Sequence, residues 1–150
     1  MKEKENMLPI NILLVDDSPG DVRLTIEALK EHRVLNNLYV ANDGIEALEA
    51  LNKTGKFKDA LRPDIILLDL NMPRMDGREV LKEIKSNPDF RSIPVVILTT
   101  SEDEQDIYKS YDGFANCYIT KPVDFKSFIN VIRDLQNFWI SIVKLPGATK

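Results

Sequence analysis

Four short apolar runs in this 150-residue chain each end in a polar residue, and this pattern constrains the fold more than any other feature. The runs, with their closing residues, cover residues 10–17, 64–69, 94–99 and 117–121. The closing residues are Asp16 with Asp17, Asp69, Thr99 and Lys121. Short runs rich in Ile, Leu and Val are typical of strands buried in a parallel sheet. Because ligands bind outside the carboxyl ends of such strands, the polar residues predict one shared site.

Helical patterns alternate with these runs. Pro19 and Asp21 favour a helix that starts near Ser18 and ends near Glu31. Further helices are predicted at about 45–51, 80–84 and 103–112 and from about 124, with a short strand at 38–41 and a polar loop at 52–63. This alternation predicts an α/β fold, a doubly wound parallel sheet of five strands in the order 2-1-3-4-5. That order places the first and third strands side by side and joins Asp16, Asp17 and Asp69.

Composition excludes several classes of protein. The net charge of −4 argues against nucleic-acid binding, which normally needs a clustered basic surface. We find no apolar run long enough to span a membrane, and the charged residues 1–9 predict a flexible arm rather than a secretion signal. The single cysteine, Cys117, excludes an intramolecular disulfide and indicates a reducing compartment, so we expect a cytoplasmic protein.

Three neighbouring carboxylates repel one another unless a cation lies between them. A site with oxygen ligands and without His or Cys favours a hard ion, and we expect Mg²⁺. A carboxylate beside such an ion can attack phosphorus, while Lys121 and Thr99 could contact the phosphoryl oxygens. Taken singly, each residue has a structural interpretation, such as a turn or helix cap for Asp16 and Asp17. Their joint occurrence at four strand ends favours a phosphoryl-accepting site.

The motifs around these residues resemble those of the receiver domain of two-component response regulators. The resemblance covers residues 10–138 and rests on four segments. These are Leu14–Ser18, Leu67–Gly77, Pro94–Thr99 and Tyr118–Pro122. It implies the flavodoxin-like receiver fold and a signalling switch that catalyses only the phosphorylation and dephosphorylation of its own aspartate.

The resemblance also assigns roles to individual residues. It implies that Asp69 accepts the phosphoryl group from a sensor histidine kinase, and that Asp16 and Asp17 bind Mg²⁺ together with Asp69. The backbone carbonyl of Asn71 would complete the protein ligands. The switch residues would be Thr99 and Tyr118, Lys121 would contact the phosphate, and Asn71 and Ser101 would tune hydrolysis. Thr100 departs from the Ala or Gly common at that position.

A longer loop at 52–63 and a chain that continues beyond residue 138 resemble the stand-alone regulators of bacterial and cyanobacterial phytochromes. Apolar residues at helical spacing extend an expected C-terminal helix as far as Val143. Residues 139–150 are then a C-terminal extension, and Phe138 and Trp139 are candidates for a homodimer interface. The alternative is that this end folds back on its own domain.

Two other functions remain open from the sequence. A phosphatase of the haloacid dehalogenase type also uses a strand-end aspartate and Mg²⁺, but it would need a second aspartate where this chain has Asn71. A receiver-like binding module that never carries phosphate usually lacks one acid or the lysine, and this chain retains all of them.

Overall fold

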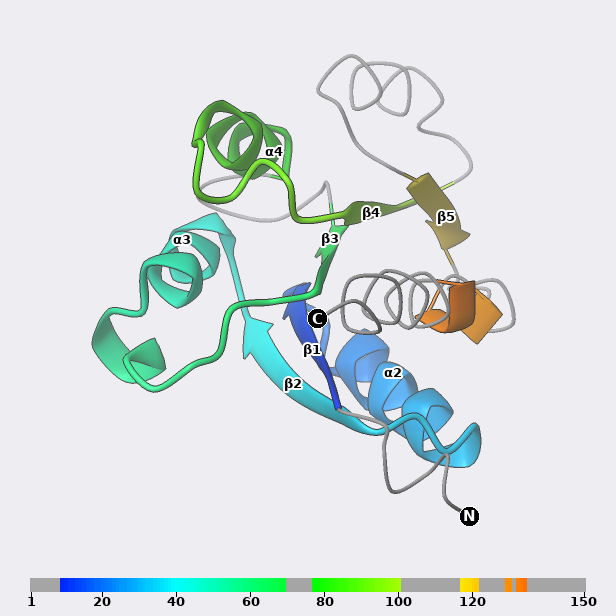
Figure 1. Cartoon of the computed structure of the whole chain (residues 1–150). Coiled ribbons are helices and arrows are strands. Elements are labelled where there is room, and N and C mark those ends of the chain that lie inside the picture. Colours follow the sequence, from blue (N-terminus) through cyan, green and yellow to red (C-terminus); the bar gives the residue numbers. More distant parts are fainter. Residues whose placement is uncertain (1–8, 70–76, 101–116, 122–128, 131, 135–150) are drawn as a thin grey trace, which may run out of the picture.

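The computed structural model describes residues 9–69, 77–100, 117–121, 129–130 and 132–134. Strands and helices alternate along the chain (Figure 1). In order, the elements are β1 (Ile10–Val15), α2 (Pro19–Glu31), β2 (Asn36–Ala41), α3 (Gly44–Asn52), the 3₁₀ turn η1 (Gly55–Phe57), β3 (Ile65–Asp69), α4 (Gly77–Ser86), β4 (Val95–Thr100) and β5 (Cys117–Lys121). The five strands are parallel and lie in the order β2-β1-β3-β4-β5. The predicted fold class and strand order are therefore confirmed.

The sheet separates two hydrophobic layers. On one face, residues of α3, α4 and η1 pack against the strands. On the other face, α2 and two residues of the C-terminal segment, Ile129 and Ile132, pack against alternate residues of the same strands. Figure 1 shows this arrangement, with α3 and α4 on one side of the sheet and α2 on the other. All five residues of β3 are buried, which explains why its sequence is almost entirely aliphatic.

The first helix begins where the sequence predicts. Ser18 is its N-cap, with an extended backbone and a side-chain oxygen that accepts the amide hydrogen of Asp21. Pro19 occupies the first turn, where its missing N–H costs nothing. Arg33 has a left-handed backbone (φ 56°) just after the helix, and its amide donates to the carbonyl of Lys30. These local signals fix α2 directly after β1 and hold its first turn next to the end of that strand.

Two segments differ from the sequence-based predictions. Strand β2 begins at Asn36, two residues earlier than predicted, where Asn36 pairs with Ile10 of β1. The side-chain amide of Asn37 also donates to that of Asn11 across this strand pair. The segment 52–63, predicted as a polar loop, contains η1 and buries Phe57 and Ala60 in the core. The prediction of a wholly polar loop was wrong for these two residues, because their burial depends on packing with α3 and α4 in the folded protein.

The turn before β4 is held from two sides. The Lys85 ammonium donates to the carbonyls of Arg91 (3.1 Å) and Ile93 (3.0 Å), and burial lowers the pKa of Lys85. The Arg62 guanidinium donates to the carbonyl of Asp89 at 2.6 Å. These contacts fix the chain where it enters β4, the strand that carries Thr99.

Some predictions fall outside the described residues. They concern the arm at 1–8, the loop at 70–76, the helix at 103–112 and the extension at 139–150. The predicted last helix is described only at 129–130 and 132–134, where the chain is helical. Within the described parts of the chain, we find no helix that is both long and apolar enough to cross a bilayer.

Candidate functional site

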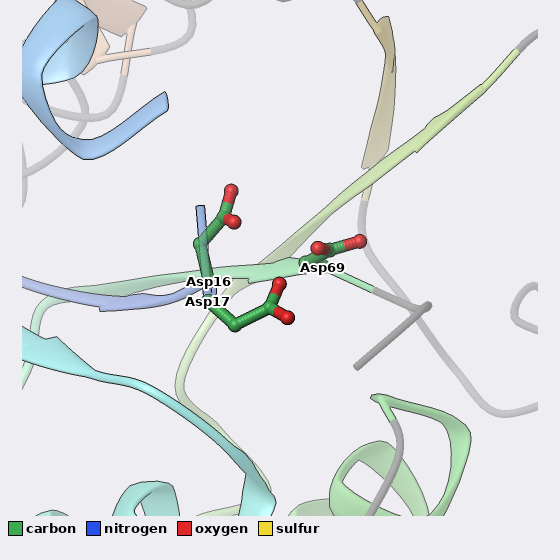
Figure 2. Close-up of side chains that lie close together, drawn as sticks. All are labelled: Asp16, Asp17 and Asp69. Carbon is green, nitrogen blue, oxygen red and sulfur yellow. The ribbon is translucent and has the colours of Figure 1, made fainter. Parts of the chain in front are cut away.

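Three carboxylates converge at the carboxyl edge of the sheet (Figure 2). Asp16, Asp17 and Asp69 each offer one oxygen, and these oxygens lie within 4.8 Å of one another. The strand register explains the meeting, because Val15 of β1 pairs with Leu68 of β3. Asp69 ends β3, and Asp16 follows β1 directly. The predicted juxtaposition of these three residues is therefore present.

The three acids differ in exposure. Asp16 is fully buried, and Asp69 is only 3% exposed, whereas Asp17 lies at the surface. Burying two ionised carboxylates is costly unless positive charge or hydrogen bonds compensate. One such bond is present, since the amide of Ser18 donates to Oδ1 of Asp16 at 2.9 Å. The backbone amide of Asp16 is also held, by the carbonyl of Ala41 at 3.0 Å. These contacts fix the position of Asp16 in the cluster, and Asp17 is the member that faces solvent.

The donor set fits a divalent cation. All three side chains present oxygen, and their spacing allows one ion to contact an oxygen of each residue. A cation there would offset the repulsion among the three carboxylates and the cost of burying two of them. Hard ions such as Mg²⁺ and Mn²⁺ prefer such ligands.

Thr99 and Lys121 lie on strands that end at the same edge. Asp69 pairs with Leu98, so Thr99 stands one residue beyond Asp69 along the neighbouring strand. In turn, Thr100 pairs with Lys121, the last residue of β5. These pairings place the carboxyl ends of β3, β4 and β5 next to one another at one edge of the sheet.

The other predicted site residues are placed only in part. Tyr118 lies on β5, paired with Ile97 of β4. The remaining four, Asn71, Ser101, Phe138 and Trp139, lie outside the described residues.

One residue of the site was missed from the sequence. Ser18 holds the carboxylate of Asp16 through its backbone amide and caps α2 with its hydroxyl. The Ser-Pro pair signalled a helix start, but a backbone contact to Asp16 carries no residue-type signal.

Comparison with known proteins gives a consistent result. Residues 12–133 match the response regulator receiver domain. The chain is 45% identical over 144 residues to the response regulator Rcp1 of Synechocystis, covering 96% of this chain and 98% of that protein.

Two solved structures are also similar. One is the Mn²⁺-bound form of response regulator Rcp1, with a TM-score of 0.74, 46% identity and coverage of 87% of this chain and 94% of that chain. The other is the phosphorylated cyanobacterial phytochrome response regulator RcpA, with a TM-score of 0.75, 45% identity and coverage of 90% and 96%.

Proposed function

The chain belongs to the response regulator receiver family, and we propose that it accepts a phosphoryl group on Asp69. The observation that carries this proposal is the meeting of Asp69 with Asp16 and Asp17 at the carboxyl edge of the sheet. Family membership also favours a receiver over the phosphatase of the haloacid dehalogenase type. We expect acetyl phosphate with Mg²⁺ to add one phosphoryl group to the intact protein, measured by mass spectrometry.

Asp69 is suited to act as the nucleophile. It is nearly buried at the end of β3, so its carboxylate is poorly hydrated and held in one place. In the proposed reaction, an oxygen of Asp69 bonds to phosphorus while the bond from phosphorus to the donor breaks. The donor leaves with that electron pair, and Asp69 becomes an acyl phosphate.

Asp16, Asp17 and Asp69 would hold the divalent ion, for which we propose Mg²⁺. The ion supplies positive charge that offsets the charge on the phosphoryl oxygens. Asp17 is the exposed member of the cluster, and a phosphodonor would approach from its side. By the family resemblance, the backbone carbonyl of Asn71 would be a further ligand, and Asn71 and Ser101 would tune hydrolysis.

Thr99 and Lys121 would respond to the new phosphate. A phosphoryl group brings roughly two negative charges and three acceptor oxygens. Its oxygens could accept hydrogen bonds from the Thr99 hydroxyl and the Lys121 ammonium. Movement of Thr99 would shift Tyr118 on the neighbouring strand and so change the surface that a partner reads.

We expect Thr99→Ala to separate phosphorylation from the response. The variant should still be labelled, because the nucleophile and the three acids remain. Its tyrosine and amide NMR signals should shift less than those of wild type on adding beryllofluoride, because the hydroxyl that follows the phosphate is missing. Thr100→Ala is the matched control and should respond fully. A full shift in Thr99→Ala would contradict the proposed coupling.

The proposed phosphodonor is a sensor histidine kinase, and we propose a phytochrome in particular. Support comes from RcpA, a phytochrome response regulator that is 45% identical. The test is to mix this protein with purified phytochrome kinases that have been phosphorylated beforehand. Failure of the phosphoryl group to transfer to this chain would contradict the proposed pairing. A cytoplasmic location, which cell fractionation would check, fits the single cysteine.

We also propose a homodimer that buries Phe138 and Trp139. The support is the apolar helical pattern of the C-terminal sequence together with the family resemblance. Light scattering should show a dimer for wild type and a monomer for a chain truncated after Asn137, with and without beryllofluoride. A wild type that stays monomeric at high micromolar concentration in both states would refute the dimer.

A further inference from the structure

The N-terminal end of α2 is attached to the acidic cluster. Oδ1 of Asp16 accepts the amide hydrogen of Ser18 at 2.9 Å. The hydroxyl of the same Ser18 accepts the amide hydrogen of Asp21 at 3.2 Å and caps the helix. In the next turn, Thr25 is buried and its hydroxyl donates to the carbonyl of Asp21 at 2.8 Å. One chain of hydrogen bonds therefore runs from a carboxylate of the cluster into the first two turns of α2.

The other end of α2 is attached to the C-terminal segment, which the structure describes at residues 129–130 and 132–134. The Arg133 guanidinium donates to the carbonyl of His32, the C-cap of α2, at 3.1 Å. Carbonyls at a helix C-terminus lack partners within the helix, and a cation there also opposes the negative end of the helix dipole. Beneath this contact, Ile129 and Ile132 are buried in the same cluster as Leu29 of α2. Figure 1 shows the segment, in orange, beside α2.

We propose that α2 transmits the state of the acidic cluster to the C-terminal segment, with Ser18 and Arg133 as positioning residues at its two ends. The inference rests on the proposed binding of Mg²⁺ by the cluster. It adds a route through α2 that is separate from the switch residues Thr99 and Tyr118. If so, metal binding reduces local opening of the C-terminal segment before any phosphoryl group is transferred.

The physical argument begins with the acidic cluster before a metal binds. Without a cation, Asp16, Asp17 and Asp69 repel one another, which works against the orientation in which Asp16 accepts from Ser18. Neutralisation removes that cost and favours the capped first turn. An α-helix of 13 residues is about 20 Å long. Because helix formation is cooperative, a more stable first turn lowers the chance that the rest of the helix opens. Through its hydrogen bond to His32 at the end of α2, Arg133 would then hold residues 129–134 more firmly.

Hydrophobic packing is a competing route for this coupling. Ile132 belongs to the same buried cluster as Leu29 of α2, and that packing does not depend on the hydrogen bond of Arg133. The two routes separate in Arg133→Gln, which removes the guanidinium but leaves both isoleucines in place. Lys30→Gln is the matched control. It removes one exposed cation from the last turn of the same helix without touching the link to His32.

The experiment is hydrogen–deuterium exchange with peptide-level mass spectrometry on full-length wild type, Arg133→Gln and Lys30→Gln, with and without saturating Mg²⁺. In wild type and Lys30→Gln, Mg²⁺ should slow exchange in α2 and in 129–134, by about fivefold, the effect of one net hydrogen bond. In Arg133→Gln, the slowing in α2 should persist while that in 129–134 falls below half. Circular dichroism confirms that each variant is folded.

Calorimetric titration with Mg²⁺ separates failure of this inference from failure of the metal site. If Mg²⁺ binds and protects α2 but leaves 129–134 unchanged in wild type, transmission through α2 is wrong. Equal protection of 129–134 in Arg133→Gln would also overturn it, in favour of packing through Ile132. Absence of Mg²⁺ binding would overturn the metal site first and this inference with it.

Discussion

Asp69→Asn is expected to abolish phosphorylation of this protein by acetyl phosphate and Mg²⁺. The amide oxygen of asparagine is a much weaker nucleophile than a carboxylate and cannot form an acyl phosphate. The substitution keeps the size of the side chain, so the buried end of β3 should remain packed. Intact-mass measurement should show one added phosphoryl group in wild type and none in Asp69→Asn.

Asp59→Asn is a suitable control for that experiment. It makes the same chemical change at an exposed aspartate outside the cluster, and it should be labelled like wild type. Treatment with hydroxylamine adds a second check, because it cleaves acyl phosphates and leaves phosphate esters of Ser and Thr intact. Undiminished, hydroxylamine-sensitive labelling of Asp69→Asn would show that another carboxylate is the acceptor.

Asp17→Asn is expected to have opposite effects on the metal-free and metal-bound protein. Without metal, it removes one of three charges that lie within 4.8 Å of one another, which should stabilise the fold by about 1 kcal/mol in a water-like dielectric. In wild type, Mg²⁺ at 100 times its dissociation constant should add about 2.7 kcal/mol, because it binds the folded state. The variant should lose most of this gain, since Asp17 is a proposed ligand.

Thermal unfolding with EDTA and with Mg²⁺ measures both effects. In EDTA, Asp17→Asn should melt a few degrees above wild type. In Mg²⁺, the melting temperature of wild type should rise above that of Asp17→Asn. Asp59→Asn again controls for the loss of one negative charge and should follow wild type in both conditions. If Asp17→Asn gained as much from Mg²⁺ as wild type, Asp17 would not be a ligand, and a lower melting point in EDTA would contradict the proposed repulsion.

If both predictions hold, the acidic cluster lowers the stability of the metal-free fold in exchange for function, a trade that is common at functional sites. Two of its acids are buried. By this proposal, the repulsion that destabilises the metal-free fold also creates the affinity for a cation. Chelation should therefore both lower the melting temperature of wild type and abolish labelling by acetyl phosphate, because unscreened carboxylates would repel the donor.

The strands and the identity of the acids were predictable from local sequence. An aliphatic run of five or six residues with polar residues at its end is shorter than a typical helix, which favours a buried strand. The alternation of such strands with helices favours a doubly wound sheet. In that topology, residues that end β1 and β3 must meet. The amino-acid sequence by itself therefore determined that Asp16, Asp17 and Asp69 share one site.

Only the tertiary structure decided which of these acids is buried and which other residues contact them. Asp16 is buried and Asp17 is exposed, although they are adjacent and chemically identical, because a strand end turns successive side chains toward different surroundings. The contact of Ser18 with Asp16 uses a backbone amide, a group that every residue except proline has, so residue type could not reveal it. The link from Arg133 to His32 joins positions 101 residues apart, and only packing of the C-terminal segment on the sheet beside α2 brings them together.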